Sequence, residues 1–277
     1  MRVIVTRPPR EAQDWVHELA QAGLSAQALP LIDILPAPDA AGLARVWQRL
    51  GNGAYASVMF VSANAVAGFF ASNSANLLVF AAPSAIKIRA WAPGPGTRKA
   101  LLQVGVAPER IDAPAREAAQ FDSEALWQVV GPQVKPGHQV LIVRGGDAQD
   151  AASVSGNGRD WLAQRLADVG ARAEFVVAYQ RARPQFDAAQ RQLATEAAGD
   201  GSVWLFSSSE AVRNLQACLP GQSWHAARAV ATHPRIAAAA REAGFGVVCE
   251  SRPALADVMA SIESLQWCDS KSLHGGP

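Results

Sequence analysis

The chain has few of the residues that build disulfide frameworks or metal sites. Its three cysteines, Cys218, Cys249 and Cys268, form no CxxC pair, and its five histidines show neither HExxH nor HxxxH spacing. We therefore expect a protein with reduced thiols and no bound metal, as is usual in the cytoplasm.

Long apolar runs and an excess of one charge sign are lacking as well. No segment approaches the ~20 apolar residues of a membrane helix, and the N-terminus (MRVIVTRPP) leads straight into a strand without an apolar signal region. The formal net charge of +1 creates no overall field for nucleic acid or a membrane surface. We expect a cytoplasmic monomer that binds neither, and any anionic ligand has to be bound by local groups.

What the chain does have is an alternation of short β-rich runs with helical segments rich in alanine and leucine. Its 277 residues exceed the usual ~100 to 200 of one domain, so two domains are expected. The apolar runs lack strict alternation, which indicates parallel strands buried on both faces in doubly wound α/β sheets. They occupy residues 3–6, 57–61, 139–144, 174–179 and 202–207.

The sequence also contains a degenerate internal repeat. Three kinds of segment occur twice: 59–66 (MFVSANAV) matches 205–212 (LFSSSEAV), 94–98 matches 233–237, and the unit at Arg7 matches the unit at Arg144. The first half starts with the Arg7 unit, whereas the second half starts with the Arg144 unit. Two similar domains are implied, and they need not be contiguous.

Seven segments, in order along the chain, resemble the uroporphyrinogen-III synthase family. They are residues 5–8, 29–32, 60–66, 94–97, 123–126, 176–179 and 206–208. The resemblance implies two flavodoxin-like domains with parallel sheets, joined by two extended linkers, with a cleft between them and no cofactor. Domain one would comprise residues 1–35 plus 181–267 and domain two residues 36–180, followed by a disordered tail, 268–277.

By the same resemblance, the substrate is hydroxymethylbilane, a linear tetrapyrrole with eight carboxylates. The family closes this chain with loss of water and inversion of the terminal (D) pyrrole ring, a lyase reaction that gives uroporphyrinogen III for heme and siroheme biosynthesis. The enzyme then needs a proton donor, a cavity that enforces the rearranging geometry, and groups that bind carboxylates.

Strand-to-helix turns are the expected carboxylate sites, because helix N-termini present free backbone N–H groups. In one domain the turn residues are Ser62, Ala63 and Asn64, and in the other they are Ser207, Ser208 and Ser209. The alternative is that these hydroxyls only cap helices, and Ser207 to Glu210 fits a capping box.

The Pro-turn units give a second set of expected carboxylate contacts: Gly94, Gly96 and Thr97 in one copy, and Thr232, His233 and Arg235 in the other. The first copy lacks P-loop spacing, which argues against nucleotide binding. The second copy lacks a hydroxyl that the family usually has, because Ile236 stands there. Arg235 or His233 could replace it.

Arginines and one tyrosine complete the expected site. Thr6-Arg7 and Arg144-Gly145 end equivalent strands, so we expect them at the substrate, although ordinary surface ion pairs would explain the arginines equally well. Tyr179 matches the family tyrosine at a strand end, and its phenol could donate the proton or orient the substrate. The alternative for Tyr179 is simple packing.

Two other functions stay open at this point. A non-catalytic, two-lobed small-molecule binding protein could use the same domains. A sugar-nucleotide-dependent transferase also has two such domains, but the phosphate fingerprint and the acidic residue expected after the first strand are missing.

Overall fold

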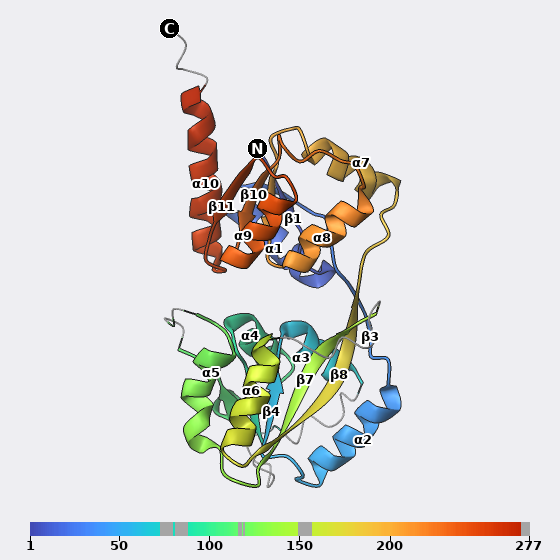
Figure 1. The fold of residues 1–277 in the computed structure, drawn as a ribbon, viewed down its shortest axis with the longest axis vertical. Helices are drawn as coiled ribbons and strands as arrows, with labels where there is room; N and C mark the ends of the chain where they lie inside the picture. Colours follow the sequence, from blue (N-terminus) through green and yellow to red (C-terminus); the bar gives the residue numbers. More distant parts are fainter. Residues whose placement is uncertain (73–79, 81–87, 116–117, 119, 149–156, 273–277) are drawn as a thin grey trace. The chain divides into compact units, whose positions relative to one another are not determined.

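The computed structural model describes residues 1–72, 80, 88–115, 118, 120–148 and 157–272. The chain divides into two compact units (Figure 1). Unit 1 comprises Met1–Asp33 and the chain from Ala182 onward, and unit 2 comprises Ile34–Arg181. The chain therefore passes between the units twice.

Unit 1 is built on a five-stranded sheet of order β11-β10-β9-β1-β2 in which all neighbours pair in parallel. The strands are β1 (Arg2–Val5), β2 (Ser25–Ala28), β9 (Val203–Phe206), β10 (Arg228–Ala231) and β11 (Val247–Glu250). The helices are α1 (Pro9–Gln21), α7 (Ala188–Ala197), α8 (Ser209–Cys218), α9 (Pro234–Glu242) and α10 (Leu255–Ser272).

Both faces of the sheet of unit 1 are covered. On one face, Val3 and Val5 of β1 pack in a cluster with Leu19 of α1 and Ile262 of α10. On the other face, Trp204 of β9 stacks among aromatic rings, and its indole N–H donates to the carbonyl of Ala197 in α7. Strands buried on both faces account for their apolar runs without alternation.

Unit 2 has a six-stranded sheet of order β3-β8-β7-β4-β5-β6, parallel from β8 to β6. The strands are β3 (Asp33–Pro36), β4 (Ser57–Phe60), β5 (Arg89–Trp91), β6 (Ile111–Asp112), β7 (Gln139–Asp147) and β8 (Arg172–Ala182). The helices are α2 (Ala40–Gly51), α3 (Ala63–Ala71), α4 (Pro95–Gln103), α5 (Ser123–Val130) and α6 (Asn157–Asp168), with short 3-10 turns at Pro108–Arg110 and Gly131–Gln133.

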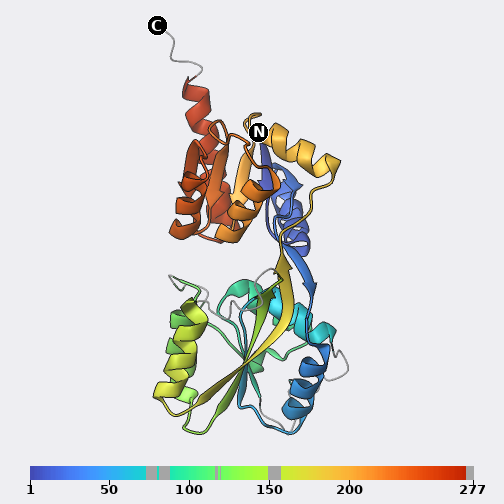
Figure 2. The ribbon, with the colours of Figure 1, turned by 45° about the vertical axis from the view of Figure 1, so that its right-hand side comes forward.

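The helices of unit 2 lie on both faces of its sheet, as Figure 2 shows. Side chains of α2, α3 and α4 share one buried cluster with Phe60 of β4 and Tyr179 of β8. Side chains of α5 and α6 share a second cluster with Met59 and Ile142. Adjacent residues of β4, Met59 and Phe60, thus enter opposite layers, as the two-residue period of a strand requires.

The two sheets have one strand order in common. Numbering β1, β2, β9, β10 and β11 as strands 1 to 5, in chain order, gives 2-1-3-4-5. Strands β8 to β6 of unit 2 have the same spatial order when β7 and β8 are counted as strands 1 and 2 and β4, β5 and β6 as strands 3 to 5, although β7 and β8 come last in the chain. This is the flavodoxin-like order. The predicted fold class, two similar doubly wound parallel sheets, is confirmed.

The predicted disorder of the tail, residues 268–277, stays a prediction. Helix α10 extends to Ser272, past the predicted end of domain one at residue 267. The chain offers no glycine or proline before Gly275 to end it. Residues 273–277 lie outside the described part. None of the helices in the described ranges is long and apolar enough to cross a membrane.

Candidate functional site

In doubly wound sheets, ligands bind beyond the carboxyl ends of strands 1 and 3, where the connections diverge to opposite faces. Those strands are β7 and β4 in unit 2, and β1 and β9 in unit 1. The turns at Arg7, Ser62 and Ser207 follow β1, β4 and β9, and Arg144 lies in the second half of β7. The Pro-turn units follow the neighbouring strands β5 and β10. The structure therefore brings them together at one sheet edge of each unit.

In unit 2, this edge carries a tyrosine–serine pair. The phenol oxygen of Tyr179 lies 3.2 Å from Oγ of Ser62, and the Tyr179 side chain is buried, with 5% exposed. Ser62 is the N-cap of α3, and its Oγ accepts the backbone N–H of Ala65 at 3.1 Å. Since both hydroxyls can donate and accept, the pair has the chemistry of a proton donor. Ala63 and Asn64 form the first turn of α3 beside it.

The two equivalent arginines both lie over aromatic rings. The guanidinium of Arg7 is 4.4 Å from the ring centre of Trp15, and that of Arg144 is 5.3 Å from the ring centre of Phe175. Arg144 is buried, with 9% exposed. Arg7 is mostly buried too, and its Nη1 lies 3.5 Å from a carboxylate oxygen of Glu11.

Burial has an electrostatic consequence at Arg7. Removal from water lowers the pKa of this guanidinium, an effect that Glu11 opposes. Its Nε is buried and has no hydrogen-bond partner in the described part of the chain. A nearby anion would stabilise this buried guanidinium by a charge-assisted hydrogen bond, and the carboxylate of a ligand is such an anion.

The polar residues of unit 1 are mostly engaged in caps and ladders. Ser208 caps α8 by accepting the N–H of Glu210, without a capping box, and Nδ1 of His233 caps α9 by accepting the N–H of Arg235. Ser209 donates weakly to the carbonyl of Arg235 at 3.4 Å. Of the serines for which capping was the alternative, Ser62 and Ser208 do cap helices. His233 caps α9 although no such role was predicted for it.

Two predicted contact residues have side chains that face the interior. Thr6 is 1% exposed, and its hydroxyl donates to the carbonyl of Leu205 at 2.7 Å, joining β1 to β9. Thr97 is 6% exposed, because the first turn of α4 packs this side chain inward. In this structure both side chains pack inside their units, and contact of either with the substrate stays a prediction.

The remaining predicted residues are accessible as backbone or side chain. Gly94 is the N-cap of α4 and supplies no side-chain cap, so the N–H groups of that first turn are capped by no side chain of the described residues. A side chain at Gly96 would meet nothing within 4 Å. Ser207 and Thr232 are half-buried, and Arg235 is exposed. Anion binding by the first turn of α4 stays a prediction.

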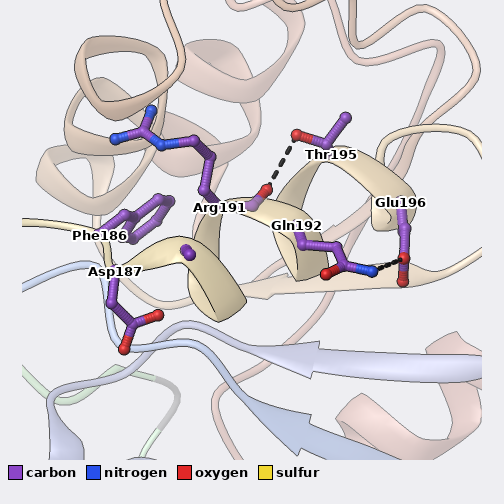
Figure 3. A pocket seen from close by; sticks show the side chains of 7 residues that line it. Phe186, Asp187, Arg191, Gln192, Thr195 and Glu196 are labelled. Carbon is purple, nitrogen blue, oxygen red and sulfur yellow. Dashed lines mark hydrogen bonds between the residues drawn. The ribbon is translucent and has the colours of Figure 1, made fainter.

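Two surface hollows of the described residues are not lined by the predicted site residues. One of about 550 Å³ runs along α7 (Figure 3), where Thr195 donates to the carbonyl of Arg191 and Gln192 bonds Glu196 within the same helix. Another of about 610 Å³ lies at the start of α5 and is lined by Asp122 and Glu124. The described residues include no group of three metal ligands. The strand ends, rather than these hollows, define the candidate site.

Comparison with known proteins decides the family. The family model described as "Uroporphyrinogen-III synthase HemD" matches residues 13–260. The chain belongs to the uroporphyrinogen-III synthase family. A uroporphyrinogen-III synthase from Chlorobaculum parvum is 28% identical over 217 residues, which cover 77% of each chain. The family match confirms the resemblance read from the seven segments. Uroporphyrinogen-III synthases are enzymes of tetrapyrrole biosynthesis.

A solved uroporphyrinogen-III synthase has the same fold. A mutant enzyme from the extremely thermophilic bacterium Thermus thermophilus superposes with a TM-score of 0.51 at 14% identity, covering 96% of this chain and 99% of the other. At that identity the likeness concerns the fold alone. It supports the two doubly wound units derived above.

Sequence reasoning missed one residue of the tyrosine–serine pair's surroundings. Gly68 lies inside α3, where a side chain would overlap the backbone carbonyl of Ala178 in β8. The available signal was a glycine within the apolar helical run AVAGFF, which indicates close packing against a neighbour.

Proposed function

We propose that this chain converts hydroxymethylbilane into uroporphyrinogen III, with Tyr179 as the proton donor. Membership of the family supports the reaction, and the single observation that carries the role of Tyr179 is its 3.2 Å contact with Ser62 at the carboxyl edge of unit 2. No other tyrosine of the chain competes for this role, because Tyr55 precedes β4 and so lies at the opposite edge.

The proposed reaction begins at the terminal hydroxymethyl group of the substrate. The C–O bond breaks as Tyr179 transfers its proton to the hydroxyl, which leaves as water, while the electron-rich pyrrole stabilises the cation. The cationic carbon then bonds to the substituted α carbon of ring D, which gives a spiro intermediate. The older bond from that α carbon to its methylene bridge breaks, and the bridge carbon bonds to the free α carbon of ring D, so that the ring is inverted. The proton on that carbon is lost and can restore the Tyr179 phenol, so the lyase reaction needs no oxidant or reductant. Exclusion of water from the cation favours closure over hydrolysis.

We propose that both units bind the carboxylates of the substrate. Arg144, the start of α3 and the start of α4 would do so in unit 2, and Arg7, Ser207 and Arg235 in unit 1. Their support is the matching position of each in the two sheets and, for Arg7 and Arg144, burial beside an aromatic ring. Binding spread over many turns is consistent with a net charge of only +1.

Product analysis tests the proposal. Hydroxymethylbilane closes spontaneously to isomer I, so the purified chain has to raise the fraction of isomer III above that of a heat-inactivated sample. An excess of isomer III supports the synthase, whereas tight binding of the substrate without this excess favours the non-catalytic binding protein. We further propose a cytoplasmic monomer, which sizing chromatography at several concentrations checks for the oligomeric state.

A further inference from the structure

The position of Tyr179 depends on an irregularity in the β7–β8 ladder. Arg144 stands opposite Val177, but Gly145 stands opposite Tyr179, so Ala178 is an extra residue in β8. In a regular ladder Ala178 would face Gly145, and Tyr179 would point to the other face of the sheet. The bulge therefore directs the phenol to the face on which α3 lies.

The ring of Tyr179 occupies the space where a side chain of residue 145 would be. A Cβ atom on Gly145 would lie 2.5 Å from Cζ of Tyr179 and 2.8 Å from its hydroxyl oxygen. Real Cβ atoms do not approach other atoms so closely. Any residue other than glycine here would displace the phenol and so change the distance between its oxygen and Oγ of Ser62.

A second glycine fixes the other side of the pair. A Cβ atom on Gly68 would overlap the carbonyl oxygen of Ala178 and lie 3.4 Å from Cβ of Tyr179. Gly68 belongs to α3, the helix that Ser62 caps. The close approach of α3 to β8 thus sets the separation between the Ser62 and Tyr179 hydroxyls.

We infer that Gly145 and Gly68, together with the bulge at Ala178, are positioning residues for the phenol of Tyr179. The inference rests on the proposed function and deepens it, since Gly145 then acts through Tyr179 and not by touching the substrate. Unit 1 has no counterpart: Pro8 follows Arg7 there, and both tyrosines of the chain lie in unit 2.

The test is a double-mutant cycle on the rate of isomer III formation, measured for Gly145→Ala, Tyr179→Phe and the double variant. Gly146→Ala is the matched control, because it crowds the same strand but would meet Val177, with its Cγ1 at 3.0 Å, and not Tyr179. We expect Gly145→Ala to lower kcat about tenfold with little change in KM, a loss of the size that a displaced proton donor causes. The double variant should be no slower than Tyr179→Phe alone.

Several outcomes overturn the inference. The first is a folded Gly145→Ala protein with the kcat of the wild type. The second is a double variant whose loss of kcat equals the product of the losses in Gly145→Ala and Tyr179→Phe. The third is a loss of kcat in Gly146→Ala as large as that in Gly145→Ala. Should Gly145→Ala not fold, it is combined with Tyr179→Ala and compared with Tyr179→Ala alone. Equal Tm values of these two proteins support the clash between residue 145 and the phenol, and a much lower Tm of the combined variant refutes it. A wild-type protein that makes no isomer III refutes the proposed function instead.

Discussion

The phenol oxygen of Tyr179 lies 3.2 Å from Oγ of Ser62, although the two residues are 117 positions apart in the chain. The contact joins strand 2 of the sheet of unit 2 to the helix that follows strand 3, across strand 1 between them. It places two hydroxyls at the edge where flavodoxin-like sheets bind ligands.

Ser62→Ala should lower both stability and activity. Loss of the cap of α3 costs about 1 kcal/mol of unfolding free energy, and Tyr179 loses its hydroxyl neighbour. Asp39→Ala is the matched control, since Asp39 caps α2 through a hydrogen bond to the N–H of Gly42 and is no part of the site. Denaturant unfolding should give similar losses for both variants, and only Ser62→Ala should slow isomer III formation. Equal activity of the two would contradict a role for Ser62 beyond capping.

Arg7→Met and Arg144→Met should each weaken substrate binding. Methionine keeps an apolar chain over the aromatic ring but removes the charge that a carboxylate would meet. We expect KM to rise about tenfold or more in each, as loss of a charge-assisted hydrogen bond does. The control is Arg241→Met, which breaks only the exposed pair with Glu250. An unchanged KM in the first two variants would assign these arginines to structure alone.

Thr6→Val should reduce stability without changing KM. The hydroxyl of Thr6 donates to the carbonyl of Leu205 inside unit 1, and valine has the same shape without the donor. Loss of this buried bond costs about 1 kcal/mol, visible as a lower midpoint in urea. A raised KM with unchanged stability would instead make Thr6 a substrate contact.

The sequence predicted the parts of this site that depend on local pattern, and it missed those that depend on packing between distant segments. The repeat located the strand ends at Ser62, Arg144 and Ser207, because parallel sheets gather those ends at one edge. It could not predict that Thr97 faces inward, since the rotation of α4 about its axis is set by packing. The bulge at Ala178 depends on pairing between distant segments, which no local pattern encodes, and the glycine in AVAGFF indicates close packing at Gly68 without naming β8 as the neighbour.

Stability should also depend on pH through Asp200. Burial would raise the pKa of its carboxyl, but the hydrogen bonds from the hydroxyl and backbone N–H of Ser202 and the ion pair with Arg2 outweigh burial and lower it. Because the pKa is lower in the folded state, the charged carboxyl stabilises the fold at any pH above its unfolded pKa of about 3.9. This stabilisation is lost as the pH falls through the pKa of the folded state. Asp200→Asn should therefore have a lower Tm than wild type at pH 7, with the difference shrinking below pH 4. A difference independent of pH would rule this charge effect out.

The most direct test of the proposed role of Tyr179 compares Tyr179→Phe with Tyr55→Phe in the isomer assay. Each variant removes one phenol oxygen from unit 2, and the buried Tyr55 hydroxyl lies before β4, away from the carboxyl edge of the sheet. The proposal predicts that wild type and Tyr55→Phe form isomer III at similar rates, while Tyr179→Phe is slower by about tenfold or more. Equal rates in all three folded proteins would contradict it.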